Sequence, residues 1–551
     1  MKKIMAIVLA SSMLVSLAGC SSSGSGSTAT TAAAAETAAA ADAGSASADA
    51  GSTDTSDRVL KIRKTQALIS TNWEFIVNTE DMPVIWDQVF EGLYGLDEAG
   101  GGYCHDLAKD VSISDDGLVY TITLVDAVFQ NGDPVTANDV VFSYNRAIES
   151  GRFNYATDMI DSVEAVDDST VQFTLLYPYS AIDHTFYTVK ISSEREVTEL
   201  GDSYGTGPHT AGTGPYYVSA YDPAGNIVLK AHEDYWGGAP DIKTVEYVLI
   251  TEDSAAVIAY ENGEIDFMQN APTTDWDSLV KASGENNAIL KGNNIRSVYI
   301  NYRSETNDGI LANELVRKAI CYAINKDAIN NVVTNGLGVP TSEYIPSSYV
   351  ETAPSADNFE TYPYDPDKAI ELLHEAGYTD EQLQAGVSVG TLTTYGAATG
   401  EKAKAAQVVQ SNLEAVGLKC DIEVQDSSII SPRLHAFDYD LCIYGDSGNY
   451  DFNNIRQQVL VDGGYSVVDL SGDDSCVDYA KIQELLAAGI ATTDISERAA
   501  IYLELWQMVA DSATIYPYLH LPVAVVWSPA IDPGDGALSP THYHIKTFSW
   551  K

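Results

Sequence analysis

One stretch of the chain, residues 107–144, carries an ordered set of local signals that few folds can satisfy. Its TITL segment alternates polar and apolar residues, which predicts a half-buried strand. The Asp-Asp-Gly turn at 115–117, ahead of that segment, predicts a hairpin. After the Asn-Gly-Asp-Pro segment at 131–134, which interrupts regular structure, Thr136 and Asp139 form the capping-box pattern that begins a helix. The stretch therefore predicts an antiparallel hairpin followed directly by a capped helix.

Length and charge limit what surrounds this stretch. A single hydrophobic core stops growing at about 250–300 residues, so a chain of 551 residues is expected to form two or more lobes. The net charge of -48 argues against nucleic acid as a partner, because phosphate binding needs clustered Lys and Arg. Solvation of the surface explains this charge most simply, and an acidic pocket for cationic ligands is the alternative.

The N-terminus has the features of an exported protein. Two lysines precede an apolar run, residues 4–15, which is too short for a stable membrane-spanning helix but typical of a signal-peptide core. Cys20 follows Leu-Ala-Gly, which resembles the lipobox of bacterial lipoproteins. This resemblance implies a signal peptide at 1–19 and a lipid on Cys20, and an ordinary cleavage site is the alternative. Residues 20–57 are almost wholly Ser, Thr, Ala, Gly and Asp, and they predict a flexible tether.

Further motifs follow in order along the chain. GTGPYYV at 212–218 predicts a rigid turn leading into a strand, and it differs from a phosphate cradle because no Lys-Ser or Lys-Thr follows it. HEDYWGGAPD at 232–241 and YENGEID at 260–266 come next. Together with the opening stretch, these motifs resemble family 5 of the bacterial extracytoplasmic solute-binding proteins of ABC importers, which take oligopeptides, dipeptides and nickel. The resemblance extends from about Arg58 to at least Tyr518.

The resemblance implies an α/β, two-lobed fold of the periplasmic-binding-protein-like kind (cluster C type), with a hinge between the lobes. The implied limits are lobe I at 58–300, with an inserted subdomain at about 82–205, lobe II at 301–516, and a return to lobe I at 517–551. The residues themselves agree with a parallel sheet in lobe II, because strand and helix signals alternate from 387 to 424.

Apolar periodicity predicts the helices that accompany these strands. The predicted ranges are residues 84–93, 314–326, 366–376, 403–416 and 498–509.

The same resemblance points to candidate ligand contacts in the cleft. In peptide binders, an aspartate after one lobe II strand holds the ligand's amine, since a buried ammonium needs a charged partner. In this chain Tyr444 precedes three candidates for that role, namely Asp446, Asn449 and Asp451, while acidic turn residues facing water are the alternative. The tryptophan common there in dipeptide binders is missing.

Aromatic side chains supply the expected walls of the cleft. Trp73 with its neighbour Asn72 in lobe I, and Tyr395 with its neighbour Thr394 in lobe II, join Tyr444 as candidates. Dipeptide binders tend to place an arginine after the strand that here ends at Tyr395, and this chain has no basic residue at that point. Longer peptides held through their main chain and neutral ligands such as oligosaccharides therefore both stay open. The expected hinge residues are Asn301, Tyr302, Tyr516 and Pro517.

Enzyme and metal motifs give little support to other classes of function. The sequence has no GxSxG, HExxH or Walker A pattern. His542 and His544 alternate as on a strand and could hold a metal, but an exposed polar face is the simpler interpretation, so we expect neither metal nor cofactor. Cys420 and Cys442 are expected to be buried free thiols, although the sequence leaves open whether they pair.

The combined prediction is a monomeric solute receptor, anchored by lipid to the outer face of the cell membrane, that captures oligopeptides and delivers them to an ABC permease. It performs no covalent chemistry. Within the family, the alternative ligands are a nickel complex or an oligosaccharide. A surface-anchored hydrolase or a peptide chaperone is the alternative from another class.

Overall fold

The computed structural model describes most of the chain after the predicted tether. The described residues are 58–68, 70–73, 82–97, 102–344, 361–447, 455–460, 468–471, 475–537, 539 and 542–551. They all belong to one compact unit, residues 54–551. The predicted signal peptide, Cys20 and the tether lie outside the described residues. Within the described part of the chain, no helix is both long enough and apolar enough to cross a membrane.

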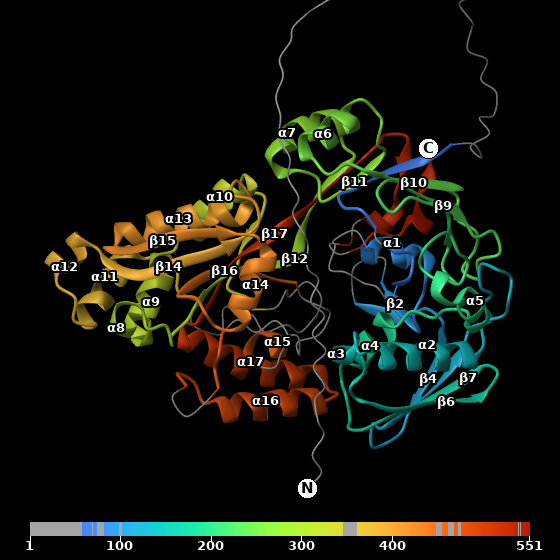
Figure 1. Ribbon diagram of the computed structural model, residues 1–551, viewed down its shortest axis with the longest axis horizontal. Coiled ribbons are helices and arrows are strands. Elements are labelled where there is room, and N and C mark those ends of the chain that lie inside the picture. Colours follow the sequence, from blue (N-terminus) through green and yellow to red (C-terminus); the bar gives the residue numbers. More distant parts are fainter. Residues whose placement is uncertain are drawn as a thin grey trace, which may run out of the picture. The chain divides into compact units, whose positions relative to one another are not determined.

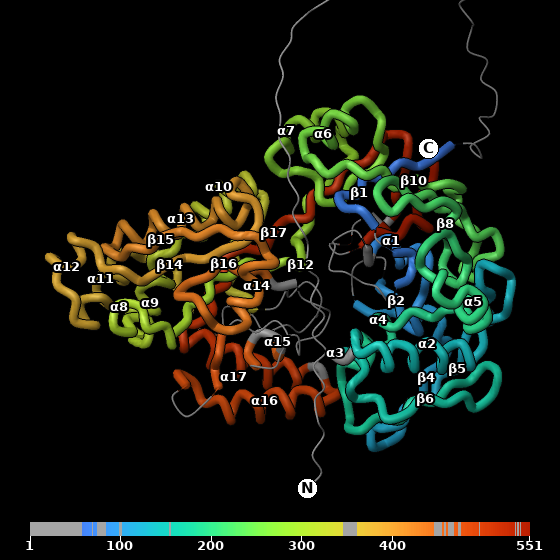
Figure 2. The backbone as a smooth tube through the Cα atoms, viewed as in Figure 1, coloured from blue at the N-terminus to red at the C-terminus, as the bar shows by residue number. Residues whose placement is uncertain are grey.

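An eleven-stranded sheet runs through the described residues and joins two groups of helices (Figure 1). Its strands, in spatial order, are β15 (Leu418–Gln425), β14 (Val387–Tyr395), β16 (Leu441–Ser447), β12 (Asn287–Ile300), β17 (Ile515–Trp527), β11 (Phe267–Gln269), β1 (Leu60–Lys64), β10 (Thr244–Leu249), β9 (Ile227–Ala231) and β8 (Tyr216–Tyr221), with β13 (Val339–Pro340) paired to β17. The β15–β14–β16 end belongs to lobe II, and the β11–β8 end belongs to lobe I. The long strands β12 and β17 are shared by both lobes (Figure 2).

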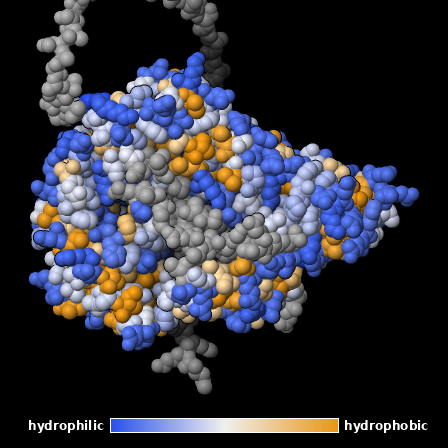
Figure 3. Space-filling model, turned by 180° about the vertical axis from the view of Figure 1, so that it is seen from behind, coloured by the Kyte–Doolittle hydropathy of each residue, from blue (hydrophilic) through white to orange (hydrophobic). Residues whose placement is uncertain are grey.

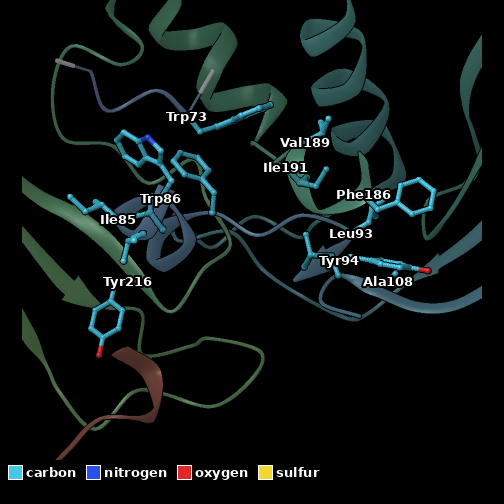
Figure 4. Close-up of a cluster of buried hydrophobic side chains, with 14 of the residues drawn as sticks. Trp73, Ile85, Trp86, Leu93, Tyr94, Ala108, Phe186, Val189, Ile191 and Tyr216 are labelled. Carbon is cyan, nitrogen blue, oxygen red and sulfur yellow. The ribbon is translucent and has the colours of Figure 1, made fainter. Parts of the chain in front are cut away.

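Lobe I has a large aromatic core (Figure 4). Its helices are α1 (Met82–Val89), α2 (Ala137–Ser150), α3 (Asn154–Thr157), α4 (Ile182–Thr188), α5 (Glu194–Leu200), α6 (Asp253–Glu261) and α7 (Trp276–Ser283). Trp73, Trp86 and Tyr216 are all less than 2 % exposed and belong to this core. Fully burying one large apolar side chain stabilises a fold by about 1.5–3 kcal/mol, so such residues dominate the stability of the lobe.

A four-stranded antiparallel sheet within lobe I confirms the opening prediction. Its order is β4 (Ala108–Ile113), β5 (Val119–Leu124), β7 (Thr170–Leu175) and β6 (Ile160–Asp167). Helix α2 begins after Thr136 with the predicted capping box, in which the Asp139 carboxylate accepts from the Thr136 backbone N–H at 3.0 Å. Val140, Tyr144 and Ala147 are completely buried on the inner face of α2.

Short strands complete the described fold of lobe I. They are β2 (Tyr94–Leu96) with β3 (Tyr103–His105), and β18 (Ile531–Asp532) with β19 (Ser549–Trp550).

Lobe II has a sheet covered on both faces, as buried parallel strands require. Successive residues of β12 show the two faces: Val298 and Ile300 belong to one apolar cluster, whereas Tyr299 belongs to another. The helices of this lobe are α8 (Thr306–Gly309), α9 (Glu314–Ala323), α10 (Lys326–Thr334), α11 (Pro366–Glu375), α12 (Asp380–Ala385), α13 (Glu401–Ala415), α14 (Ser427–His435), α15 (Arg456–Val459), α16 (Tyr479–Ala491) and α17 (Ile495–Ser512). The parallel pairing of β14 with β15 confirms the predicted strand–helix–strand unit.

Two predicted helices end clearly earlier in the structure than the sequence suggests, and α17 (Ile495–Ser512) extends beyond the predicted range 498–509 at both ends. The helix expected at 314–326 is wrong at its end, because α9 stops at Ala323 and Asn325 caps a separate helix, α10. The helix expected at 84–93 ends at Val89. The chain then passes so close to α4 that a Cβ on Gly92 would lie 2.4 Å from the backbone oxygen of Phe186, which explains the glycine.

The visible surface agrees with the strong net charge. In Figure 3, hydrophilic residues cover much of the face shown, and the apolar patches between them are separate. This distribution fits the interpretation of the net charge of -48 as surface solvation.

Candidate functional site

The carboxyl ends of the lobe II strands meet at one edge of the sheet. Strand β14 ends at Tyr395, and the parallel strand β16 ends at Ser447. Strand β12 runs antiparallel to β16 and pairs Arg296 with Gly445, so it crosses this edge on its way from lobe I. In open α/β sheets, ligands bind outside the carboxyl ends of the strands. This edge is therefore the candidate ligand-binding side of lobe II.

The structure brings the two predicted lobe II tyrosines together at this edge. The ring centroids of Tyr395 and Tyr444 lie 5.7 Å apart with an interplanar angle of 52°. Both rings are partly exposed, and Tyr444 also contacts the buried ring of Tyr299 at 6.1 Å. Thr394 is completely buried, and its hydroxyl donates a long hydrogen bond of 3.5 Å to the Ile443 backbone oxygen. The tyrosines offer aromatic surface to a ligand, and Thr394 supports the strand beneath them.

Three charged side chains join the tyrosines, and we call Arg296, Glu401 and Lys402 the edge cluster. Arg296 Nε donates to Glu401 Oε1 at 2.8 Å, and Lys402 Nζ lies 3.0 Å from the same oxygen. Lys402 Nζ also lies 4.4 Å from the ring centroid of Tyr395. Burial raises the pKa of the Glu401 carboxyl, but the two cations outweigh burial and hold this pKa below its usual range.

The sequence analysis missed this cluster. It looked for a base directly after Tyr395, whereas Lys402 comes from the first turn of α13 and Arg296 from β12. The available signal was Glu401-Lys402 directly before the helix predicted at 403–416, which places both side chains near the end of the preceding strand.

The predicted amine anchors are only partly described. The backbone of Asp446 pairs with Ile295 at the end of β16, directly beside the edge cluster. The side chain of Asp446 and all of Asn449 and Asp451 lie outside the described residues. Their role in ligand binding stays a prediction.

The lobe I candidates occupy a different setting. Trp73 is completely buried, its indole N–H donates to Ser192 Oγ at 2.9 Å, and its ring packs 5.3 Å from that of Phe153. Asn72 is 2 % exposed, and its backbone N–H donates to Ser70 Oγ. In this structure both residues therefore support the lobe I core, and a contact with ligand stays a prediction for each.

The chain passes from one lobe to the other along the shared strands β12 and β17. The pairing of β12 with β17 shifts register between Lys291 and Ile295. At this irregularity a Cβ on Gly292 would lie 2.3 Å from the Leu521 backbone oxygen, so the two backbones approach too closely for any side chain. The completely buried ring of His520 lies here, with Nδ1 3.2 Å from the Gly292 backbone oxygen.

Charged side chains hold β12 and β17 together where the chain passes between the lobes. His520 Nε2 lies 3.0 Å from Glu343 Oε2, and Lys291 Nζ donates to the same oxygen at 3.1 Å. Burial raises the pKa of Glu343, but the contacts with His520 and Lys291 outweigh it and lower the pKa to about 2. The carboxylate is thus held ionised between the two strands that join the lobes.

The predicted hinge residues lie on the lobe II side of this passage. The amide of Asn301 and the hydroxyls of Tyr302 and Tyr516 all donate to backbone oxygens within lobe II. Pro517 lies at a second register shift of β17, where proline's missing N–H is tolerated. The observed irregularity at 291–295 precedes Asn301, and a hinge role for the four predicted residues stays a prediction.

A direct contact joins the lobes at another point. The backbone N–H of Ser180, in lobe I, donates to the Ile490 oxygen of α16 at 2.9 Å. The Ser180 hydroxyl donates to the Gly489 oxygen at 3.3 Å, and the buried Arg498 Nε donates to that oxygen at 3.1 Å. This contact ties the end of α16 to lobe I.

A separate group of buried charge lies inside lobe I. Glu91, which is 4 % exposed, accepts hydrogen bonds from the Tyr235 hydroxyl at 2.5 Å and from Trp236 Nε1 at 2.9 Å. Burial and the nearby carboxylate of Asp106 raise the pKa of Glu91 to about 7, although the hydrogen bonds act in the opposite direction. The bonds explain why Tyr-Trp stands in the HEDYWGGAPD motif.

The expectation of an exposed polar face at His542 is wrong. His542 is 9 % exposed, and its Nε2 lies 3.1 Å from Asp87 Oδ2 and 2.9 Å from the Tyr187 hydroxyl. Lys190 completes the group, with Nζ 2.9 Å from the other Asp87 oxygen. Burial lowers the pKa of His542. Among the described residues, no three His, Cys, Asp or Glu side chains are arranged to hold a metal ion.

The cysteines of the described residues form no disulfide with one another. Cys420 and Cys442 are both buried thiols, as predicted. Burial raises the pKa of the Cys420 thiol to about 12, so this side chain acts as an apolar group.

Comparison with known proteins identifies the family. The profile described as "Bacterial extracellular solute-binding proteins, family 5 Middle" matches residues 103–460. The chain belongs to this family. Among curated relatives, the glutathione-binding protein GsiB of Salmonella typhi is 30% identical over 346 residues, 61% of this chain. GsiB of Escherichia coli O1:K1 / APEC is 28% identical over 346 residues. The matched region spans 64% of the length of each relative.

Solved structures share the fold over nearly the whole body. The ABC transporter substrate-binding protein CtaP of Listeria monocytogenes matches with a TM-score of 0.76 and 24% identity, covering 90% of this chain and 99% of CtaP. NikA of Brucella suis in complex with Fe(III)-EDTA gives 0.78 and 20%, covering 90% and 100%. The oligopeptide-binding protein AppA of Bacillus subtilis, in complex with a nonapeptide, gives 0.70 and 19%, covering 90% and 99%. The two-lobed family 5 fold is thus shown, while the ligands of these proteins differ.

Proposed function

We propose that this protein is the solute-binding receptor of an ABC importer, and that it binds oligopeptides between its lobes for delivery to a membrane permease. Family membership supports the receptor role. Among proteins of similar fold, AppA binds a nonapeptide, and the relative GsiB is named for binding glutathione, itself a short peptide. The receptor binds and releases its ligand without covalent chemistry.

The observation that carries the peptide proposal is the composition of the lobe II edge. Tyr395 and Tyr444 present partly exposed rings beside the edge cluster, where the strands end. Aromatic faces suit apolar side chains of a ligand, whereas a few convergent polar groups fix its orientation. A peptide carries both kinds of group. The charged side chains of the edge cluster suit the charged and polar groups of a peptide better than a neutral oligosaccharide.

Capture of the natural ligand tests this function. Protein purified under native conditions from its own host is analysed by native mass spectrometry, and the released ligand is sequenced by fragmentation. One peptide per chain, with unchanged mass after prolonged incubation, is expected. Binding should also raise the thermal midpoint, because ligand stabilises the folded state. Cleavage of model peptides would contradict the receptor proposal and favour a hydrolase, and a captured nickel complex would replace the peptide proposal.

The location of the protein is a separate proposal that rests on the N-terminal sequence. Cys20 carries the lipid, and residues 20–57 hold the folded body away from the outer face of the cell membrane. The protein acts there as a monomer. A Cys20→Ser variant is expected to leave the membrane fraction and to fail to incorporate labelled fatty acid. Retention of label by this variant would contradict lipidation at Cys20.

A further inference from the structure

The shared strands β12 and β17 are weakly joined where the chain passes between the lobes. In Figure 1 both strands run from one group of helices to the other. Their ladder skips residues 292–294 of β12, and Pro522 of β17, which pairs with Lys291, has no N–H to donate. Since backbone hydrogen bonds are interrupted here, side chains have more influence on how the two lobes are held.

Glu343 connects both strands to lobe II at this place. It follows α10 and β13, whereas Lys291 lies on the part of β12 that pairs with the lobe I end of β17. Its Oε2 lies 3.1 Å from Lys291 Nζ and 3.0 Å from Nε2 of His520. We call Lys291, Glu343 and His520 the crossover cluster. A rotation of one lobe against the other at the strand irregularity would change the distances within it.

The hydrogen bonds of His520 define its protonation state. Nδ1 lies 3.2 Å from the Gly292 backbone oxygen, which can only accept. Although burial raises the pKa of Glu343, its contacts with His520 and Lys291 lower this pKa to about 2, so the carboxylate facing Nε2 is ionised and can also only accept. Two acceptors, one at each ring nitrogen, need two N–H donors. Only the protonated imidazolium has both, so the geometry is that of a charged His520.

The surroundings of His520 make this charge sensitive to pH. The ring is completely buried, and the charged side chains that contact it or share its acceptor are Glu343, after β13, and Lys291 of β12. Two further cations on adjoining elements, Arg296 of β12 and Lys326 of α10, donate to other residues. A buried imidazolium depends on its carboxylate partner. When the ring loses its proton, one acceptor faces a nitrogen that has no hydrogen, and the ion pair with Glu343 is lost.

We propose that His520 is a positioning residue that sets the angle between the lobes: its protonated ring holds β12, β17 and lobe II in one arrangement, and loss of the proton releases this arrangement. The constraint is present at low pH and is lost as pH rises. Histidine ordinarily changes charge near neutral pH, so the joint between the lobes responds to the pH outside the cell. This inference goes beyond the proposed function, because it holds for any solute.

Pulsed electron paramagnetic resonance on ligand-free protein tests the inference by measuring the distance between the lobes. Nitroxide labels are attached through Lys230→Cys on β9 of lobe I and Glu371→Cys on α11 of lobe II, which are both exposed positions. Serine replaces Cys20, Cys104 and Cys476 in this protein. We expect one narrow distance distribution at pH 6, and at pH 9 a mean distance that differs by about 3 Å or more, as for a hinge that has been released.

Three variants assign the response to the crossover cluster. His520→Gln and Glu343→Gln each remove one partner of the ion pair, and both should show the high-pH distribution at pH 6 and at pH 9. His374→Gln is the matched control, since His374 Nε2 lies 2.9 Å from Asp380 in an exposed pair of lobe II, and it should keep the wild-type response. Thermal unfolding of each variant reports whether it is folded.

Nuclear magnetic resonance of protein containing ¹⁵N-labelled histidine gives a second readout. The signal that is missing in His520→Gln belongs to His520, and at pH 6 it should show protons on both ring nitrogens. A single protonated nitrogen at pH 6 would overturn the inference.

The remaining outcomes are equally decisive. A wild-type distance that stays the same from pH 6 to pH 9 would overturn the inference without the use of any variant. A pH response that persists in folded His520→Gln would overturn it as well. None of these results depends on a ligand, so they leave the proposed function to its own test.

Discussion

Two groups of buried charge in this protein differ in how their bonds are completed. Inside lobe I, both carboxylate oxygens of Glu91 accept hydrogen bonds from protein donors, Tyr235 and Trp236. At the edge of lobe II, two cations share one oxygen of Glu401, and the other oxygen has no donor among the described residues. The difference separates a carboxylate held by neutral donors, whose pKa is raised, from one held by cations, whose pKa is lowered.

The largest expected effect belongs to the lobe I group. Glu91→Ala leaves the Tyr235 hydroxyl and the Trp236 indole N–H buried without an acceptor, which we expect to lower the free energy of unfolding by about 3 kcal/mol. Urea unfolding monitored by tryptophan fluorescence measures this loss. Peptide affinity in the absence of urea should stay within threefold of wild type. A variant of unchanged stability that no longer binds peptide would contradict a structural role for Glu91.

The same group predicts a pH dependence. The folded-state pKa of Glu91 is raised to about 7 from a usual 4.5, so the folded protein holds this proton more tightly than the unfolded chain. The resulting stabilisation is complete below about pH 4.5 and is lost as pH rises through 7, by about 3 kcal/mol in total. The difference in urea midpoint between wild type and Glu91→Gln, measured from pH 5 to 8, reports it. A constant difference across this range would contradict the raised pKa.

Gly445→Ala probes the geometry of the lobe II group without changing a charge. The added Cβ would meet Arg296 Nη1 at 2.2 Å, so the guanidinium must move. We expect this overpacking to lower the free energy of unfolding by about 1.5 kcal/mol. Urea unfolding monitored by tryptophan fluorescence measures this loss. Gly207→Ala is the control because nothing lies within 4 Å of its added Cβ. Equal stability of the Gly445→Ala and Gly207→Ala variants would contradict a fixed position of the guanidinium over Gly445.

The smallest effect is expected where the lobes touch. Ser180→Ala removes the long hydroxyl bond to Gly489 but keeps the backbone bond to Ile490. We expect peptide affinity to fall about twofold, since such a bond contributes about 0.5 kcal/mol to the contact between the lobes. Ser150→Ala in α2, whose hydroxyl bonds only within lobe I, should leave affinity unchanged. A loss of more than tenfold would show that this contact between the lobes contributes far more to binding than one hydrogen bond.

The sequence predicted best those features that depend on neighbouring residues. The capping box at Thr136 and the buried face of α2 follow from residues three or four positions apart, and both are confirmed. The helix predicted at 314–326 was wrong because apolar periodicity continues across the cap at Asn325. Local patterns show where apolar faces lie more reliably than where helices end.

The candidate site could be predicted only in part. Family resemblance placed Tyr395 and Tyr444 at the edge of lobe II, where the structure brings them together. Arg296 was missed because its partner Glu401 is 105 positions away, and only the strand pairing brings them into contact. The burial of His542 was missed for the same reason, because Asp87 and Tyr187 reach it from distant parts of the chain.

The account depends most on one claim, that the protein binds intact peptides as the receptor of an importer. Native mass spectrometry of ligand-free protein mixed with a pool of synthetic tri- to hexapeptides tests it in one experiment. The account predicts one intact peptide bound per chain. A mixture in which no peptide is bound, or in which peptides are cleaved, would contradict it.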